Sequence, residues 1–356
     1  MKNEEKAIFA LREIFEKYGY APYKMSKFEE YDLYVKNKDF LISDNIITFT
    51  DVSGKLMALK PDVTLSIIKN SKDAPESIQK VYYNENVYRV SKSTGTFKEI
   101  MQVGLECLGE IDRYSIFEVI TLAAKSLKSI SDFFVLDISH LGVLSEIIEG
   151  FNVNKDTENL IYKCIGEKNL HELSIICKNA GVPDEKKKIL EQLISCYGSV
   201  KDVFENIKGI VKNVCTEKTV NEFSEIMTAL LSSEFSDKIR IDFSVVNDVK
   251  YYNAIVFRGF VDGIPSSILS GGQYDKLMQK MHRTSGAIGF AVYLDMLSRL
   301  DDDTELYDVD VLLLYNEDDS IEDISRAVEK LSADGKRVKA ARSIPDKITY
   351  RELVKR

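Results

Sequence analysis

A helical stretch in the middle of the chain, from about residue 141 to 235, separates two stretches rich in short strand-like segments. Before it, β-type runs occupy about 46–49, 55–59, 80–83, 86–90 and 99–108, and after it such runs return at 239–246, 251–261 and 287–292. The middle stretch instead shows helical periodicity, for example at 186–196 and 220–231. Because helices and strands are segregated, the pattern predicts an α+β fold with a mostly antiparallel sheet.

These changes in character also predict how the chain is divided. We expect residues 1–140 and 236–300 to form the β-rich core, and residues 141–235 to form a helical insertion. The acidic run at 301–308, DDDTELYD, is typical of a polar linker. Beyond it, a strand, a helix and a strand are predicted at 309–315, 321–331 and 337–340, which indicates a small or incomplete C-terminal α/β unit at 309–356.

Composition disfavours several classes of protein. The 48 Lys and Arg against 57 Asp and Glu leave a net charge of −9, unlike a dedicated nucleic-acid binder. The five cysteines lack C-x-x-C spacing and the three histidines lie far apart, so neither a disulfide framework nor a metal site is expected. No apolar run approaches the ~20 residues that span a bilayer, and the N-terminus does not read as a signal peptide. We therefore expect a cytoplasmic protein without membrane contact.

Four clusters of polar residues and glycines stand out in the β-rich parts. The first is LKPDVT at 59–64, and the second combines Arg89 with the strand that carries Gln102, Gly104 and Glu106. On a strand these last three alternate onto one face, and the glycine would let a ligand approach the backbone. The third cluster is KYYN at 250–253, and the fourth is SGGQYD at 270–275.

Each cluster also has a simple structural interpretation. Asp62 can cap a helix that begins near Thr64, and the strand with Gln102 and Glu106 can present a solvated sheet face. Tyr251 and Tyr252 can pack on opposite faces of a strand, and the paired glycines can break a strand into a turn. Any one cluster fits such an interpretation, but four of them in this order favour a binding site.

Together the clusters resemble the catalytic core of class II histidyl-tRNA synthetases over about residues 5–300. YYN-x-x-x-F followed some twenty residues later by GG-x-YD is quite specific for histidine-recognising members. The resemblance implies a six-stranded antiparallel catalytic sheet, an inserted helical domain and a homodimer. It also implies a set of histidine contacts, namely Asp62 and Thr64 at the α-amino group, Arg89 at the carboxylate end, Gln102 facing the amino acid, Glu106 and Tyr252 at the imidazole, and Tyr251 close by.

The same resemblance exposes departures at the positions that handle ATP. Ser91 stands where the family has a Glu that reads adenine, and Thr96 where a loop Arg is expected. Asn247 replaces a catalytic Arg, and Met296 replaces an ATP-binding Arg. Each lost phosphate-facing cation would remove roughly 3 kcal/mol of transition-state stabilisation. We therefore expect no catalytic residues and no cofactor in this chain.

A core that keeps amino-acid contacts and loses ATP contacts is similar to a known synthetase-like family, the regulatory subunits of ATP phosphoribosyltransferase. This resemblance implies a non-catalytic chain that binds and activates the short-form catalytic subunit and mediates feedback by L-histidine, as a homodimer within a hetero-oligomer. Two alternatives stay open. One is a divergent histidyl-tRNA synthetase. The other is a synthetase-like ligase or binding module for another amino acid or small amine, for which Asp62 in place of Glu and Lys250 leave room.

Overall fold

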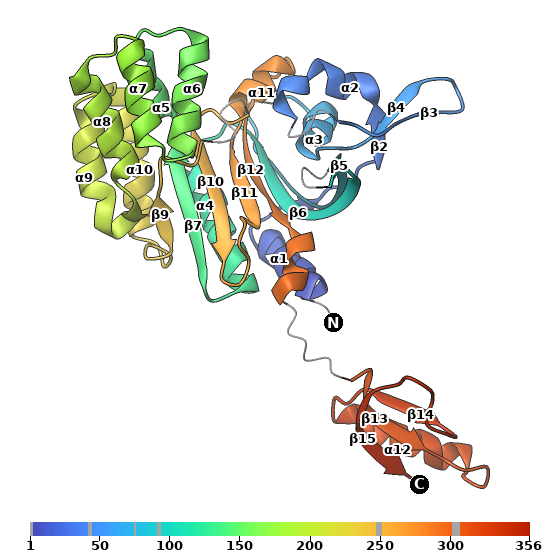
Figure 1. Cartoon of the computed structure of the whole chain (residues 1–356). Helices are drawn as coiled ribbons and strands as arrows, with labels where there is room; N and C mark the ends of the chain where they lie inside the picture. The colour runs from blue at the N-terminus through green and yellow to red at the C-terminus, as the bar shows by residue number, and fades with distance from the viewer. Residues whose placement is uncertain (1–2, 42–44, 75, 91–93, 247–250, 301–306) are drawn as a thin grey trace. The chain divides into compact units, whose positions relative to one another are not determined.

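The computed structural model describes residues 3–41, 45–74, 76–90, 94–246, 251–300 and 307–356 (Figure 1). Two of the four positions that depart from the family's ATP-handling residues, Ser91 and Asn247, lie outside these residues, as does Lys250. The chain divides into two compact units, Met1–Ser298 and Arg299–Arg356.

The larger unit is built on a sheet that contains nine strands in the described part of the chain. Their order is β1-β5-β6-β12-β11-β10-β7-β9-β8. The six consecutive strands from β5 to β7 are antiparallel to their neighbours, whereas β1 is parallel to β5 and β9 is parallel to β7. The bounds are β1 Ala21–Pro22, β5 Gln79–Val90, β6 Phe97–Gly109, β7 Phe134–His140, β8 Gly198–Ser199, β9 Ile239–Ile241, β10 Ile255–Val261, β11 Leu269–Gln273 and β12 Gly286–Tyr293. The expected antiparallel core is thus confirmed, with three short strands added at its edges.

Two local predictions were wrong. The runs at 80–83 and 86–90 form the single strand β5, and the paired glycines Gly271 and Gly272 lie within β11 instead of breaking it. A Cβ atom at Gly271 would collide with Phe290 and with the backbone of Gly289 on the neighbouring strand. The glycines therefore allow close contact between strands, and no turn is needed there.

Two helices, α1 (Asn3–Lys17) and α4 (Arg113–Ile130), cover one face of this sheet. Asp112 caps α4 by accepting a hydrogen bond from the Ser115 amide at 2.7 Å. Leu127 of α4 lies directly over Gly259, where a Cβ atom would meet its methyl groups. Because successive residues of a strand face opposite sides, the side chain of Arg258 lies on the other face, away from α4.

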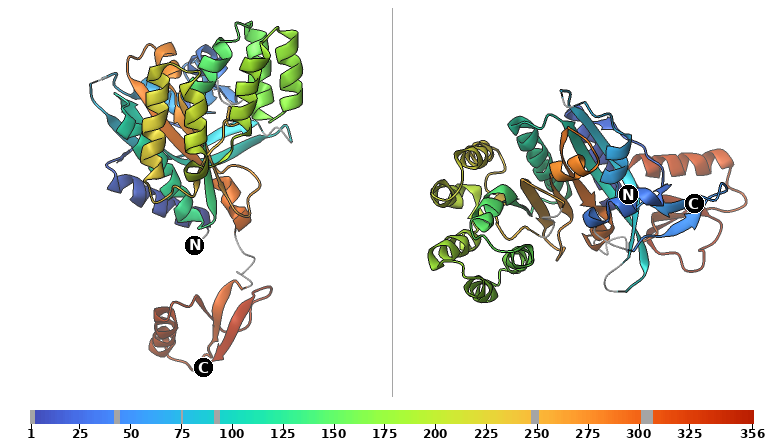
Figure 2. Two further views of the ribbon diagram at one scale, coloured as in Figure 1. Left: turned by 90° about the vertical axis from the view of Figure 1, so that its left-hand side faces the viewer. Right: turned by 90° about the horizontal axis from the view of Figure 1, so that it is seen from above.

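The helical segment inserted between β7 and β9 contains six helices. Figure 2 shows them as the green and yellow group that begins at the end of β7. Asn154, Asn169, Ser199 and Thr216 each cap the helix that follows, which explains why these helices begin where they do. The helices are α5 Leu141–Glu149, α6 Lys155–Gly166, α7 Leu170–Asn179, α8 Asp184–Ser195, α9 Val200–Lys212 and α10 Glu217–Leu231.

A second, three-stranded sheet with the order β2-β4-β3 packs near β5 together with short helices. Ala58 of β4 and Val63 of the LKPDVT segment share one apolar cluster with Tyr83 of β5 and Leu277 of α11, so this segment packs between the two sheets. The bounds are β2 Phe28–Glu30, α2 Tyr31–Lys36, η1 Lys38–Phe40, β3 Thr48–Thr50, β4 Leu56–Leu59, α3 Thr64–Asn70, α11 Asp275–Lys280 and η2 Leu294–Leu300.

From residue 307 onward, the described part of the smaller unit forms a three-stranded parallel sheet with one helix. Its order is β14-β13-β15, with β13 (Val309–Leu314) in the centre. The helix α12 (Ile321–Ala333) connects β13 to β14 (Val338–Ala341), as predicted, and β15 (Tyr350–Lys355) is a strand that the sequence patterns missed. Asp308, which the sequence assigned to the linker, is hydrogen-bonded to Thr349 and so belongs to this unit.

Candidate functional site

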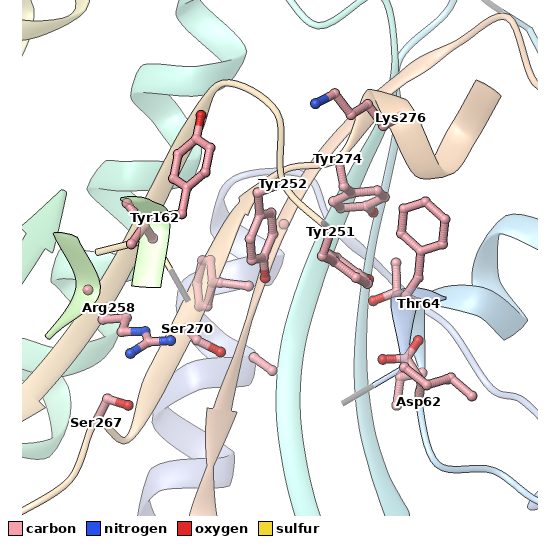
Figure 3. Close-up of a pocket in the computed structure, with 18 of the residues that line it drawn as sticks. Asp62, Thr64, Tyr162, Tyr251, Tyr252, Arg258, Ser267, Ser270, Tyr274 and Lys276 are labelled. Atoms are coloured by element: carbon pink, nitrogen blue, oxygen red, sulfur yellow. The ribbon is translucent and has the colours of Figure 1, made fainter. Parts of the chain in front are cut away.

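A cavity of about 1230 Å³ opens on the sheet face opposite α4, and the start of α3 and the helices α5 and α6 contribute to its walls (Figure 3). The structure brings the proposed histidine contacts together here, although they come from segments almost 200 residues apart. All seven line the cavity, namely Asp62, Thr64, Arg89, Gln102, Glu106, Tyr251 and Tyr252.

Glu106 on β6 is the most perturbed carboxyl group of this cavity. Its side chain is only 2% exposed, and it accepts hydrogen bonds from Thr64 Oγ1 at 2.8 Å and from the Tyr274 hydroxyl at 2.5 Å. Burial raises the pKa of Glu106 to about 8, although the two hydrogen bonds act in the opposite direction and lower the pKa. At neutral pH the group is therefore largely protonated and can either donate or accept a hydrogen bond.

Asp62 and Arg89 form the polar pair beside this carboxyl group. Arg89 Nη2 lies 3.9 Å from Asp62 Oδ2, while Arg89 Nε donates to the Pro61 carbonyl at 2.8 Å. Asp62 also accepts a hydrogen bond from the Leu65 amide at 2.9 Å, so the capping role predicted for it is present as well. Burial raises the pKa of Asp62, and the positive charge of Arg89 opposes this shift.

Three tyrosines supply the aromatic part of the cavity. The ring centroids of Tyr251 and Tyr252 are 4.8 Å apart, and those of Tyr251 and Tyr274 are 5.7 Å apart. The interpretation that Tyr251 and Tyr252 pack on opposite faces of a strand is wrong, because both precede β10 and line the same cavity. A ring-shaped ligand would find apolar faces here next to the carboxyl group of Glu106.

Two glycines shape the floor of the cavity. At Gly289 on β12, a Cβ atom would collide with the Glu106 carboxyl group and with the Leu105 carbonyl. At Gly104 on β6, a Cβ atom would collide with the Tyr83 hydroxyl and the Phe290 carbonyl. The expectation that Gly104 opens the backbone to a ligand is therefore wrong, since a side chain of the neighbouring strand occupies that space.

Thr96 and Met296, the two described positions at which this chain lacks an arginine of the synthetase pattern, are not among the residues that line the cavity. Thr96, immediately before β6, is exposed, and its hydroxyl lies 2.7 Å from that of Thr94. Met296 lies in η2, and its sulfur accepts a hydrogen bond from Ser266. Neither side chain carries a charge that could bind phosphate.

Several lining residues were missed by the sequence analysis. Tyr274 was noted only as part of the SGGQYD motif and Arg258 only as part of the run 251–261, and Tyr293 lies just beyond the predicted run 287–292. The period-two alternation of β10 was the available signal for Arg258, because it places a charged residue between the buried Phe257 and Gly259. Nothing in the sequence indicated that Tyr162 of the inserted α6 would also line the cavity.

Two general features of the described residues bear on function. No group of three or more His, Cys, Asp or Glu among them is arranged to hold a metal ion. No helix in the same residues is both long and apolar enough to cross a bilayer.

Comparison with known proteins places this geometry in a family. Residues 1–297 match the family model of histidyl-tRNA synthetase. An ATP phosphoribosyltransferase regulatory subunit from Caldanaerobacter subterraneus is 31% identical over 80% of this chain and 75% of its own length. The corresponding subunit from Oceanobacillus iheyensis is 27% identical over 80% and 71%. A histidine–tRNA ligase from Methanocaldococcus jannaschii is 29% identical over 85% and 73%.

Solved structures share the fold. A protein from Bacillus halodurans described as an ATP phosphoribosyltransferase regulatory subunit/histidyl-tRNA synthetase matches 99% of this chain and 93% of its own with a TM-score of 0.78 at 23% identity. A chain of the ATP phosphoribosyl transferase (HisG:HisZ) complex from Thermotoga maritima matches 81% of this chain and 96% of its own with a TM-score of 0.63 at 19% identity. With its α+β class II synthetase fold, the chain belongs to the histidyl-tRNA synthetase-like family that includes the regulatory subunits of ATP phosphoribosyltransferase.

Proposed function

We propose that this chain is a non-catalytic regulatory subunit. In this role it binds and activates a short-form ATP phosphoribosyltransferase and mediates feedback by L-histidine in the first step of histidine biosynthesis. Support comes from relatives that carry the regulatory-subunit name and from the fold shared with a chain of the Thermotoga complex. The proposal includes a homodimer within a hetero-oligomer located in the cytoplasm.

The observation that carries this proposal is the contrast between two sets of positions. All seven proposed histidine contacts line one cavity, whereas Thr96 and Met296 supply no cation where the synthetase pattern has arginines. Adenylation needs several positive charges on the phosphates of ATP. Binding of an amino acid alone does not need these positive charges, so the seven proposed histidine contacts are sufficient for a sensor of histidine.

The chemistry of the cavity suits an imidazole ring. Histidine presents two ring nitrogens, of which one donates and the other accepts in the neutral form. Glu106, with its pKa near 8, can give its proton to the accepting nitrogen, and the resulting carboxylate and imidazolium would attract one another. Asp62 and Arg89 lie beside it as partners for the amino and carboxylate groups of the ligand.

A divergent histidyl-tRNA synthetase is the second candidate, and the match to the archaeal ligase over 85% of the chain favours it. A synthetase would catalyse histidine-dependent exchange between pyrophosphate and ATP. A sensor would bind histidine without exchange. A ligase or binding module for another amino acid would show its strongest binding with that amino acid.

The experiment combines these readouts on the purified full chain. Calorimetric titration with each of the twenty amino acids identifies the ligand, and a pyrophosphate-exchange assay with L-histidine tests for activation. We expect saturable binding of L-histidine, no exchange, and at least tenfold weaker binding in Glu106→Gln. Glu99→Gln, an exposed change on the same strand, serves as the control and should bind histidine as the unmodified chain does. Robust exchange would show that the chain is a working synthetase.

A further inference from the structure

The aromatic wall of the cavity, formed by Tyr251, Tyr252 and Tyr274, comes from two separate segments of the chain. Tyr251 and Tyr252 precede β10, whereas Tyr274 directly follows β11. Figure 3 shows the three side chains as one group in the cavity, in agreement with the short distances between their rings. The arrangement of this wall therefore depends on the contacts that hold the two segments together.

Asp275 joins these two segments through its carboxylate. Asp275 Oδ2 accepts hydrogen bonds from Gln273 Nε2 at 2.7 Å and from Asn253 Nδ2 at 3.2 Å. Asp275 Oδ1 accepts a third hydrogen bond, at 3.0 Å, from the Ala287 amide. One side chain thus connects the segment before β10, the end of β11 and the start of β12.

The surrounding backbone places the carboxylate at this junction. The Asn253 amide donates to the Gln273 carbonyl at 3.0 Å, and the Tyr274 amide donates to a carbonyl of β12 at 2.9 Å. At Gly286 of β12, a Cβ atom would lie only 2.9 Å from Asp275 Oδ1. The glycine therefore leaves the space that the carboxylate occupies.

The polar side chains of this network lie behind the cavity wall. Asn253, Gln273 and Asp275 are not among the residues that line the cavity. Asn253 Oδ1 and Gln273 Oε1 are buried and have no hydrogen-bond partner among the described residues. Each amide group is therefore oriented by its hydrogen bond to Asp275, because a reversed amide would place its oxygen against the carboxylate.

We propose that Asp275 is a positioning residue for the amino-acid end of the cavity. Its carboxylate fixes the spacing between the segments that carry Tyr252 and Tyr274, and it thereby holds the Tyr274 hydroxyl at hydrogen-bond distance from Glu106. A charged acceptor forms stronger hydrogen bonds than a neutral one, so a carboxylate suits this junction. The inference rests on the proposed function for the identity of the ligand, whereas the contact between Tyr274 and Glu106 can be tested without a ligand.

The place of Asp275 at a helix start requires a matched control. Asp275 is the first residue of the short helix α11, where a negative charge stabilises the positive end of the helix. Asp184 is likewise the first residue of α8, and it pairs with Lys187 at 3.1 Å. Because the Asp184 side chain is 82% exposed, Asp184→Asn removes the same charge from the same helix position at the surface.

The test compares Asp275→Asn with a double variant that restores the hydrogen bonds. In Asp275→Asn the introduced amide group presents hydrogens where the carboxylate presented an oxygen, so Gln273 and Asn253 lose their shared acceptor. Adding Gln273→Glu supplies an acceptor for these hydrogens and restores the net charge, and Asn253 can reverse its amide group to accept as well. Circular dichroism and urea unfolding verify that each variant is folded.

Calorimetry on the full chain measures the affinity for L-histidine. We expect at least tenfold weaker binding in Asp275→Asn and unchanged binding in Asp184→Asn. The double variant Asp275→Asn with Gln273→Glu should recover an affinity within threefold of that of the unmodified chain. The inference fails if Asp275→Asn binds L-histidine within twofold of the unmodified affinity, or if Gln273→Glu recovers none of the loss.

Infrared titration of the Glu106 carboxyl group is the readout that a purely structural role of Asp275 would not change. The hydrogen bond from Tyr274 lowers the pKa of Glu106. We expect Asp275→Asn to raise this pKa, but not to raise it further in a chain that already carries Tyr274→Phe. An unchanged pKa in folded Asp275→Asn, or an equal rise in both chains, would overturn the inference. If the unmodified chain binds no L-histidine, the proposed function fails, and this titration still decides the inference.

Discussion

The Tyr274 hydroxyl donates a 2.5 Å hydrogen bond to Glu106 Oε2 on the floor of the cavity. The two residues are 168 positions apart in the chain, and Gly289 on the strand between them leaves the space that the Glu106 carboxyl group occupies. This contact joins the second and fourth sequence clusters, and it determines how Glu106 titrates. The first two predictions follow from it.

Glu106 should make stability depend on pH. In the folded chain this carboxyl group keeps its proton up to about pH 8, whereas in the unfolded chain it loses it near pH 4.5. The folded state binds the additional proton between these values, so this group lowers the free energy of unfolding as pH rises through that window, by at most about 1.4 kcal/mol per pH unit. Urea unfolding at pH 5.5 and 7.5 should show a smaller difference in Glu106→Gln than in the unmodified chain. An identical difference would contradict the assigned burial of Glu106.

Tyr274→Phe should raise the pKa of Glu106 further. The hydrogen bond from Tyr274 favours the ionised carboxylate and therefore lowers the pKa of Glu106. Without this hydrogen bond, less opposes the upward shift of the pKa that burial causes. We expect an upward shift of about one unit, the equivalent of one hydrogen bond to a charged group. Infrared titration of the protonated carboxyl band that disappears in Glu106→Gln measures it. A downward shift would show that the contact does not exist in solution.

Gly289→Ala should destabilise the chain and weaken ligand binding together. The added methyl group would meet the Glu106 carboxyl group and the Leu105 carbonyl, and the latter cannot rotate away. We expect a loss of about 1–3 kcal/mol, which is typical of overpacking. Gly209→Ala is the matched control. It lies inside α9 with nothing near its added methyl group, and it should stabilise the chain by about 0.5–1 kcal/mol. Chemical denaturation of both variants provides the comparison.

The ion pair of Lys60 and Glu85 should contribute to stability because its cation is buried. Lys60 has no exposed side-chain surface, and its Nζ atom lies 2.6 Å from Glu85 Oε2. Glu85→Gln leaves this cation without its charged partner and should cost about 3 kcal/mol of folding free energy. Adding Lys60→Met should recover part of the loss. In the exposed pair of Lys17 and Glu13, Glu13→Gln should cost less than about 0.5 kcal/mol. Equal losses in Glu85→Gln and Glu13→Gln would contradict the burial of Lys60.

Much of the fold could be predicted from local patterns, because amphipathic helices and alternating strands report directly which faces are buried. The helical periodicity at 186–196 and 220–231, for example, predicted most of α8 and α10 correctly. The errors arose where a contact between strands decides the structure. Gly271 and Gly272 resemble a turn in isolation, yet Gly271 allows close contact with β12, and Gly272 lies against the Ile255 carbonyl of β10 and the Tyr252 ring. Gly104 accommodates Tyr83 in the same way.

The residues of the candidate site could likewise be predicted only in part from the sequence. Asp62, Gln102 and Glu106 could be selected because their motifs resemble a family, and the structure places them in one cavity. Arg258 and Tyr162 could not, since their part in the cavity depends on how the sheet and the inserted helices meet. No local pattern in the sequence carries that information.

Reconstitution with the catalytic subunit tests the central claim most directly. The phosphoribosyltransferase rate of the short-form subunit from the same organism is measured alone, with this chain, and with this chain plus L-histidine. The account predicts a rate that rises when the chain is added and falls again with histidine, and a chain carrying Glu106→Gln should need at least tenfold more histidine for the same inhibition. An unchanged rate in all mixtures, with histidine-dependent pyrophosphate exchange by the chain alone, would contradict the account.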